Sequence, residues 1–201
     1  MNHFSKKQLN LINISLDIIL KEGIQSLTIK NLSTRAGVTE PAIYRHFKSK
    51  FDILYNLLDF FEKHSEIFLE NINKNQSVGL EKLKIFFLTH CKRFNDNKAF
   101  AIIMFSEEIF INNKELESKL FQIIKKQKKV LISIIHESQK NNLIISDIPE
   151  EHIFTLIIGS LRFLVSQWKM TKFKNNLKNM GEEYWISLEN LIKIKSENKS
   201  I

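Results

Sequence analysis

The stretch "TIKNLSTRAGVTEPAIYRHFKSK", residues 28–50, places one glycine between two short segments with helical spacing. Gly37 can supply the tight turn of a helix-turn-helix, and Ser33 is small enough to lie where the two helices cross. Apolar residues can hold the second helix against the first, namely Ile29, Leu32, Val38 and Ile43. The spacing therefore predicts a helix from Thr28 to about Ala36 and a second from Thr39 to about Phe47.

The outer side of the second segment carries small and polar side chains. Pro41 lies in the first turn, where its missing N–H costs little, and Ala42 lets the helix approach a DNA groove closely. The amides at a helix start favour phosphate. The residue types predict a DNA-binding surface made of Thr28, Thr39, Glu40, Pro41, Ala42, Tyr44, Arg45, His46, Lys48 and Lys50. On spacing alone, a helical corner with a solvated charged face is the alternative.

The charge of the chain is concentrated near this stretch. The 201 residues carry a formal net charge of +8. Eight Lys and Arg side chains against three acidic ones give residues 1–50 a net charge of +5, whereas the rest of the chain, with 22 basic and 19 acidic side chains, carries +3. A basic N-terminal unit joined to a nearly balanced larger one indicates a polyanion-binding head attached to another domain.

The remaining sequence favours helices throughout. Only 5 glycines and 2 prolines occur, too few for the turns of a many-stranded sheet. We expect a first helix from Ser5 to Lys21, a long fourth one starting at the Ser49-x-x-Asp52 signal, and later helices at about 78–95, 98–111, 114–141, 149–170 and 176–196. The predicted fold is all-α with about nine helices. Residues 1–48 form a three-helix head, and residues 49–201 form a helical ligand-binding and dimerisation body joined to it by the fourth helix.

Composition argues against several classes of protein. The single cysteine, Cys91, allows no internal disulfide and indicates a reducing, cytoplasmic setting. The most apolar run, Ile153–Val165, is shorter than the roughly 20 residues that span a bilayer, so we expect no membrane segment. Neither a nucleophile–base motif nor a tight pair of metal ligands occurs, so we expect no enzyme, metal or cofactor; the side chains considered for a metal are His90, Cys91, His136 and His152.

Residues 8–55 resemble the DNA-binding head of TetR-family transcriptional regulators. The matching segments are "TIKNLSTRAG" and "VTEPAIYRHFKSKFDIL", which together cover residues 28–54. The glycine turn and second helix are followed by the family's aromatic-x-His-Phe-x-x-Lys signature, here Tyr44, His46, Phe47 and Lys50. The resemblance implies a homodimer in which each head reads half of a near-palindromic operator in double-stranded DNA. It also implies that a ligand bound in the body moves the heads.

The resemblance assigns roles residue by residue. It implies phosphate contacts at Thr28, Thr39, Tyr44, His46 and Lys50, base-facing positions at Pro41, Ala42 and Arg45, and a place in the head core for Phe47. Glu40 departs from the small residue that the family often has nearby. A carboxylate there could repel phosphate or accept a hydrogen bond from the N4 amine of cytosine. The sequence does not choose between the two.

The body holds a dense set of aromatic residues with helical spacing. A packed core and an apolar ligand pocket with His90 as a polar contact both fit this pattern. The second interpretation predicts a site for a small apolar or aromatic ligand at Phe86, Phe87, His90, Phe94, Met104, Phe105, Phe121 and Phe154.

The last two helices are candidates for the contact between two copies of the chain. Apolar residues occupy nearly every face between Ile153 and Trp168, so this helix must be covered on more than one side. Two helices from each subunit could form a four-helix interface, with contacts at Gly159, Phe163, Tyr184, Trp185, Leu188 and Leu191. Packing within one chain is the alternative.

Three functions fit these observations. The first is a sequence-specific DNA-binding transcriptional regulator, a repressor that a small apolar ligand releases by changing the spacing of the heads. The second keeps the DNA binding but gives the body a protein partner, as in an architectural or cell-division factor. The third is an all-α enzyme or small-molecule carrier with an incidental helix-turn-helix. Salt-dependent binding to two half-sites would exclude the third, and release by a small molecule would favour the first.

Overall fold

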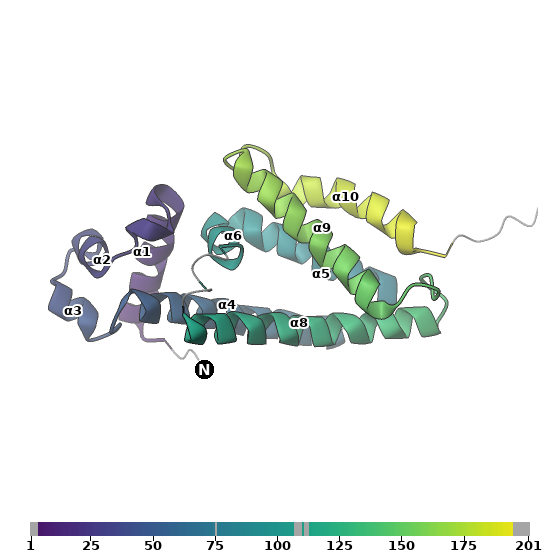
Figure 1. Cartoon of the computed structure of the whole chain (residues 1–201), viewed down its shortest axis with the longest axis horizontal. Coiled ribbons are helices and arrows are strands. Elements are labelled where there is room, and N and C mark those ends of the chain that lie inside the picture. Colours follow the sequence, from purple (N-terminus) through teal and green to yellow (C-terminus); the bar gives the residue numbers. More distant parts are fainter. Residues whose placement is uncertain (1–3, 75, 107–109, 111–112, 195–201) are drawn as a thin grey trace, which may run out of the picture. The chain divides into compact units, whose positions relative to one another are not determined.

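The computed structural model describes residues 4–74, 76–106, 110 and 113–194, and this part of the chain contains nine α-helices (Figure 1). They are α1 (Lys6–Glu22), α2 (Ile29–Ala36), α3 (Glu40–Tyr44), α4 (Lys50–Lys74), α5 (Gly79–Asp96), α6 (Lys98–Met104), α8 (Lys114–Lys140), α9 (Glu150–Met170) and α10 (Leu177–Ile192), with a short 3-10 helix, η1, at Ile24–Ser26. The predicted all-α fold is confirmed. The chain divides into two compact units, Met1–Glu66 with Asn97–Ile123 and Ile67–Asp96 with Ile124–Ile201. The division predicted from sequence, 1–48 and 49–201, stays a prediction.

Helix ends follow local hydrogen bonding. Ser5 and Gln8 form a capping box at the start of α1, because the Ser5 hydroxyl accepts the Gln8 amide at 3.2 Å and the Gln8 side chain accepts the Ser5 amide at 3.0 Å. The helix predicted at 98–111 is shorter than expected, since α6 ends at Met104 and Phe105 leaves the helical conformation. Residues 107–109 and 111 of that predicted helix lie outside the described residues.

The last predicted helix also ends early. Lys193 is already extended, with φ −71° and ψ 138°, and it forms an antiparallel bridge with Ile144 instead of a further helical turn. Residues 195 and 196 of the prediction lie outside the described residues. The third helix likewise ends at Tyr44, and the amides of His46 and Phe47 both donate to the carbonyl of Ile43 in a final turn.

The second unit is held by close packing of α10 against α5. The Trp185 indole lies 5.6 Å from the Phe87 ring between centroids. Gly181 allows this approach, because a Cβ atom there would come within 2.6 Å of the Cys91 sulfur. Burial of Cys91 raises the pKa of its thiol to about 12, so this side chain acts as a small apolar residue.

A nearly buried ion cluster joins α4 to α8 in the first unit. The Lys119 ammonium donates to Asp59 at 2.9 Å and to Glu62, and Lys63 donates to Asp59 at 2.7 Å. Burial alone would raise the pKa of Asp59, but hydrogen bonds from Lys63 and Lys119 outweigh it and hold the pKa below 3.8. For Lys119, burial lowers the pKa, and the bonds to Glu62 and Asp59 raise it above 10.5. The cluster therefore stabilises the fold at pH values between the lowered pKa of Asp59 and the raised pKa of Lys119.

We expect Lys119→Met to lower the free energy of unfolding by about 3 kcal/mol at pH 7, because it removes the ammonium group that both carboxylates share. The difference from wild type should shrink as the pH falls through 3.8 and below, where protonation removes the charge on Asp59. Urea denaturation at a series of pH values measures it. Lys125→Met, at an exposed position of α8, is the control and should change stability by less than about 0.5 kcal/mol. An equal loss in both variants would contradict the role given to the cluster.

Candidate DNA-binding interface

The helix-turn-helix depends on a left-handed glycine. Gly37 has φ 65° and ψ 32°, and its amide donates to the carbonyls of Ser33 and Thr34 at the end of α2. The amide of Val38 also donates to Ser33, at 3.1 Å. An L side chain at this φ would be strained although a Cβ added there would meet no atom within 4 Å, so the requirement for glycine comes from the backbone. The predicted turn is confirmed.

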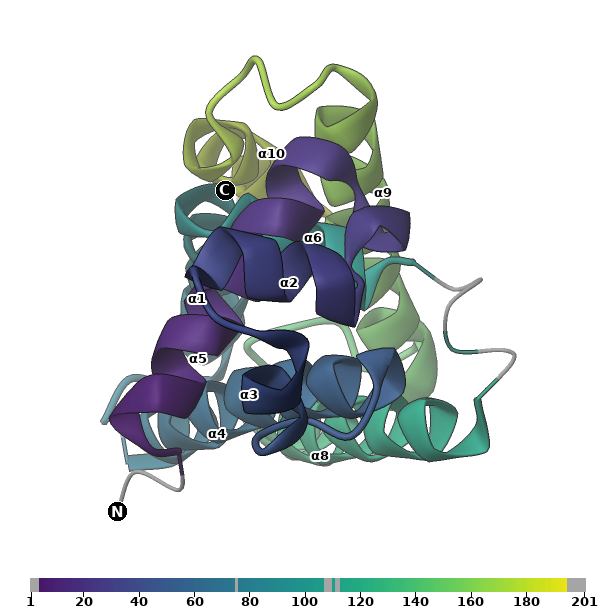
Figure 2. The same ribbon diagram turned by 90° about the vertical axis from the view of Figure 1, so that its left-hand side faces the viewer.

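Apolar contacts then fix the direction of α3. Leu32, Ile43 and Phe47 are fully buried, and Ser33 is buried where α2 and α3 meet. Since one side of α3 is held in this way, its other side faces outward (Figure 2). Tyr44, for example, exposes 52% of its surface. The exposed residues of this segment are Thr39, Glu40, Pro41, Tyr44 and Arg45, whereas Ala42 and His46 are half-buried.

The hydroxyl groups of Thr28 and Thr39, at the starts of α2 and α3, differ in their hydrogen bonds. The Thr28 hydroxyl accepts the Asn31 amide at 3.0 Å and so caps α2, which leaves its own proton to donate. Thr39 precedes α3 but makes no side-chain capping bond. Both are therefore suited to donate to a phosphate oxygen.

Lys48 and Lys50 also have different surroundings. Lys48 is exposed, and its backbone amide donates to the Asp52 carboxylate at 2.7 Å, which orders the start of α4. The Lys50 ammonium lies 3.4 Å from two oxygens of Gln25, and burial lowers its pKa. Of the two lysines, Lys48 is the one directed to solvent.

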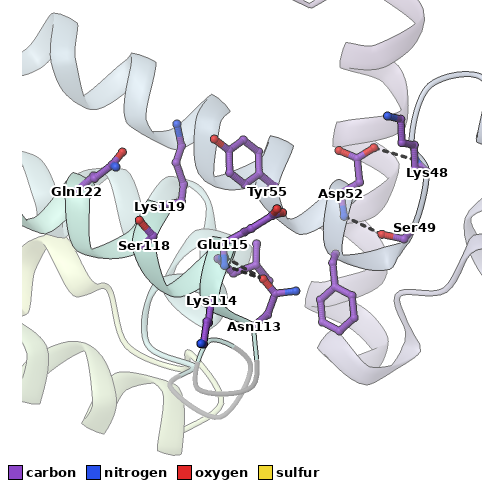
Figure 3. A pocket seen from close by; sticks show the side chains of 12 residues that line it. Lys48, Ser49, Asp52, Tyr55, Asn113, Lys114, Glu115, Ser118, Lys119 and Gln122 are labelled. Atoms are coloured by element: carbon purple, nitrogen blue, oxygen red, sulfur yellow. Dashed lines mark hydrogen bonds between the residues drawn. The ribbon is translucent and has the colours of Figure 1, made fainter.

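The start of α4 also forms one wall of a groove of about 790 Å³ within the first unit (Figure 3). The opposite wall is formed by Asn113 and the first turns of α8, as far as Gln122. Phe51 and Tyr55 are exposed along it, and the Asp52 carboxylate is occupied by Lys48 and by Asn56. Basic and acidic side chains alternate on these walls, so the groove has no single charge preference.

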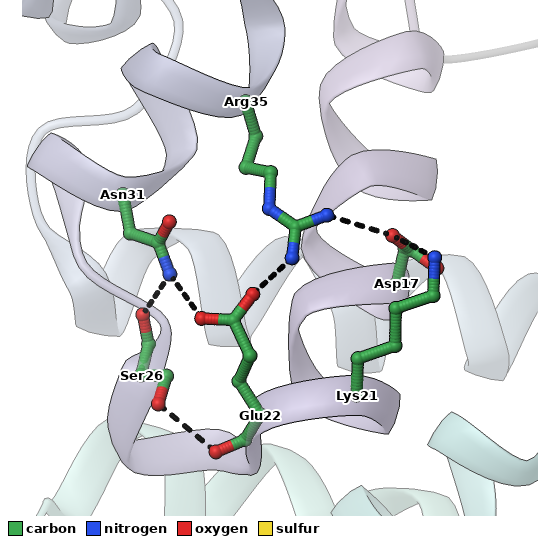
Figure 4. A network of polar contacts seen from close by, with 6 residues as sticks. All are labelled: Asp17, Lys21, Glu22, Ser26, Asn31 and Arg35. Atoms are coloured by element: carbon green, nitrogen blue, oxygen red, sulfur yellow. Dashed lines mark hydrogen bonds and ion pairs between the residues drawn. The ribbon is translucent and has the colours of Figure 1, made fainter.

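A polar network that was not predicted from the sequence holds α1, η1 and α2 together (Figure 4). The Arg35 guanidinium pairs with Glu22 and, at 3.4 Å, with Asp17. The Asn31 amide donates to Glu22 at 2.9 Å and to the Ser26 carbonyl at 3.0 Å. These bonds, from Asn31 first and then Arg35, lower the pKa of Glu22. Partners 13 and 18 residues apart leave no periodic signal in the sequence.

The predicted ligand residues are only partly brought together. His90 lies among three rings, with centroids 4.2 Å from Phe86, 5.5 Å from Phe68 and 6.1 Å from Phe94. Phe87 faces Trp185 instead, and Phe154 lies 5.5 Å from the Lys128 ammonium. Met104, Phe105 and Phe121 belong to the other unit. Placing Phe121 in an enclosed pocket was wrong, because it exposes 66% of its surface on α8.

His90 is neutral and incompletely hydrogen-bonded. Burial, with a smaller repulsion from Arg93, lowers its pKa to about 4 despite a backbone hydrogen bond that opposes the shift. Nδ1 lies 3.0 Å from the Phe86 carbonyl oxygen, which can only accept, so Nδ1 carries the proton. Nε2 is then a lone-pair acceptor, and no group of the described residues forms a hydrogen bond with it.

The predicted dimer residues divide into two groups. Trp185 and Leu188 are buried where α10 packs within its own chain, so assigning them to a contact between copies was wrong. Helical spacing placed them on an apolar stripe but could not show that α5 covers it. Gly159, Phe163, Tyr184 and Leu191 are exposed, and Leu156 and Met170 continue the exposed stripe along α9.

This geometry, a glycine-turned helix pair with an outward second helix and an all-helical body, is that of a helix-turn-helix DNA-binding protein. Residues 11–56 match the bacterial regulatory proteins of the tetR family, and residues 59–190 match the C-terminal region of YsiA-like proteins. The chain belongs to the TetR family and is a DNA-binding transcriptional regulator.

Two relatives illustrate the similarity. The nucleoid occlusion factor SlmA of Vibrio vulnificus is 23% identical over 172 residues, 86% of this chain and 88% of that protein. The fatty acid metabolism regulator protein of Bacillus subtilis is 26% identical over 174 residues, 85% of this chain and 88% of that protein.

Solved structures share the fold. The ketosteroid regulator KstR2 of Mycobacterium tuberculosis has a TM-score of 0.82 at 16% identity, covering 96% of this chain and 98% of that one. FadR of Bacillus subtilis, solved in complex with stearoyl-CoA, has a TM-score of 0.75 at 22% identity. The match covers 92% of this chain and 98% of that one. Among the described residues, no helix has the length and hydrophobicity needed to cross a membrane, and no three potential ligand side chains gather as a metal site would require.

Proposed function

We propose that this regulator is a repressor that acts as a homodimer on a near-palindromic operator and leaves it when a small apolar ligand enters the body. The observation that carries the DNA-binding part is the outward side of α3, where Tyr44 and Arg45 are exposed at the end of the helix while Ile43 and Phe47 anchor the other side. We assign phosphate contacts to Thr28, Thr39, Tyr44, His46, Lys48 and Lys50, and base contacts to Pro41, Ala42 and Arg45. The protein would act in the cytoplasm and without catalysis.

The ligand part of the proposal combines the site and the relatives. His90 lies among Phe68, Phe86 and Phe94, which gives a polar atom inside an apolar, aromatic surrounding. One similar structure holds stearoyl-CoA, and one relative is named as a fatty acid metabolism regulator. A molecule with a long apolar chain fits both observations, and long-chain acyl-CoA is the probe of choice.

The exposed stripes of α9 and α10 support the dimer. Phe163 and Leu191 each expose 65% of their surface, and Phe163 lies on one exposed stripe of α9 with Leu156 and Met170. A contiguous exposed apolar stripe, unlike a single exposed residue, is typical of a protein interface. A Cβ added at Gly159 would meet no atom within 4 Å, so this glycine leaves room for a second helix. A self-complementary contact through these helices would set the distance between two heads.

Selection of bound DNA from a random pool tests the DNA-binding part. We expect wild type to select two inverted half-sites. Arg45→Ala should lose discrimination at one base position of each half-site, by about 1–3 kcal/mol, because it removes a base contact. Lys48→Ala should weaken binding to all sequences alike. It should also reduce the slope of log K against log salt concentration by about 0.9, because one phosphate contact is lost. Selection of no common sequence by wild type would contradict the proposal.

Addition of stearoyl-CoA to the complex with the selected DNA tests the ligand part. We expect the apparent DNA affinity to fall at least about tenfold, which corresponds to a coupling free energy of roughly 1.4 kcal/mol. CoA without the acyl chain is the control ligand and should not release the DNA. His90→Leu should weaken the response, whereas Phe121→Ala, at an exposed position, should leave it unchanged. Retention of DNA at saturating acyl-CoA would favour a body that binds a protein partner.

Replacing one exposed leucine tests the dimer. Leu191→Glu should dissociate the dimer, because it places a charge in an apolar contact. Ile186→Glu is the matched control, since Ile186 is equally exposed, 64% against 65%, and lies on another side of α10. Sedimentation equilibrium measures the masses. Equal dissociation, or none, in both variants would contradict the assigned face.

A further inference from the structure

A small concavity lies beside the outward helix of the first unit, and α1 forms part of it. Its volume is about 340 Å³. Lys7 and Asn10 of α1 line one side, and Arg45 and His46 line the other. Between them lie apolar residues from α1, α2, the turn and α3, namely Leu11, Ala36, Val38, Ala42 and Ile43. Neither Lys7 nor Asn10 was predicted from the sequence to contact DNA.

The chemistry of this concavity selects for a polyanion with an apolar part. Every polar side chain that lines it can donate a hydrogen bond, two of them are permanent cations, and none is a carboxylate. The two acidic residues of α1, Asp17 and Glu22, are paired with basic side chains and do not line the concavity. Glu40 lies between Val38 and Ala42 in the chain but is not among the lining residues either. A free phosphate could pair with the two basic side chains but would make no favourable contact with the apolar lining residues.

Val38 is the lining residue that favours a ligand with an apolar part. This residue follows the turn glycine, lines the concavity and exposes 44% of its surface, so its methyl groups can be covered by a bound molecule. The sugar of a DNA strand presents C–H groups between its phosphates. A strand laid in the concavity would cover Val38 with a deoxyribose while Lys7 and His46 contact phosphates on either side of it.

We infer that α1 forms a second wall of the DNA interface. One strand of the operator half-site lies in the concavity between α1 and α3, with Lys7 paired to a phosphate and the Asn10 amide donating to the same backbone. The inference rests on the proposed DNA binding. It adds that the interface is wider than the helix-turn-helix and the start of α4.

Two neighbouring lysines provide the test. Lys6 and Lys7 both lie in the first turn of α1 and both are exposed, but only Lys7 lines the concavity. We expect Lys7→Gln to weaken binding to the selected DNA about fivefold at low salt and to reduce the slope of log K against log salt by about 0.9. Lys6→Gln removes the same charge and should change the affinity less than about twofold. Fluorescence anisotropy between about 50 and 200 mM salt measures both.

Asn10→Ala extends the test to an uncharged group. It should weaken binding without changing the salt slope, because no charge is lost. Circular dichroism melts check that all variants fold. The inference is overturned if Lys6→Gln and Lys7→Gln lose equal affinity, which would indicate unlocalised attraction, or if neither loses any while Lys48→Ala does. Failure of wild type to select any DNA would instead contradict the proposed function.

Discussion

The left-handed backbone at Gly37 is the constraint on which the DNA-binding surface depends. It ends α2 by satisfying the carbonyls of Ser33 and Thr34, and it turns the chain so that α3 packs against α2, with Ile43 and Leu32 both fully buried. With Ile43 and Phe47 buried, α3 has one direction in which its other side can point. A five-residue helix has little stability of its own, so this contact rather than helix propensity holds it in place.

The charges of the first unit are divided between internal support and an outward surplus. Asp17 and Glu22 are used within the network that joins α1 to α2, and Asp52 caps the start of α4. The acidic groups of the head thus act as structural partners, apart from Glu40, which is exposed in the first turn of α3. Most of the basic side chains that remain, among them Lys48, face solvent, and they account for the positive charge of residues 1–50.

Local signals in the sequence were sufficient for the helices and the turn, and long-range contacts were not. Gly37, the Ser49–Asp52 signal and the 3.6-residue period each act within a few residues, so they identified α2, α3 and α4. The same period marked Trp185 and Leu188 as apolar but could not say that α5, rather than a second copy, covers them. The prediction that Phe121 lines a ligand pocket was wrong for the opposite reason. A large apolar residue can be exposed to solvent, and no neighbouring residue in the sequence signals that exposure.

His90 limits the chemistry of any molecule that reaches it. Its ring is neutral at physiological pH, so it gives no ion pair to a carboxylate. With Nδ1–H committed to the Phe86 carbonyl, Nε2 can only accept. An ester or thioester carbonyl beside Nε2 would face it with a second acceptor and leave both unsatisfied, at a cost of about 1–3 kcal/mol. A hydroxyl or an amide N–H would satisfy it. A ligand that bound here would therefore place apolar groups against the phenylalanine rings and meet Nε2 with a hydroxyl or an amide N–H.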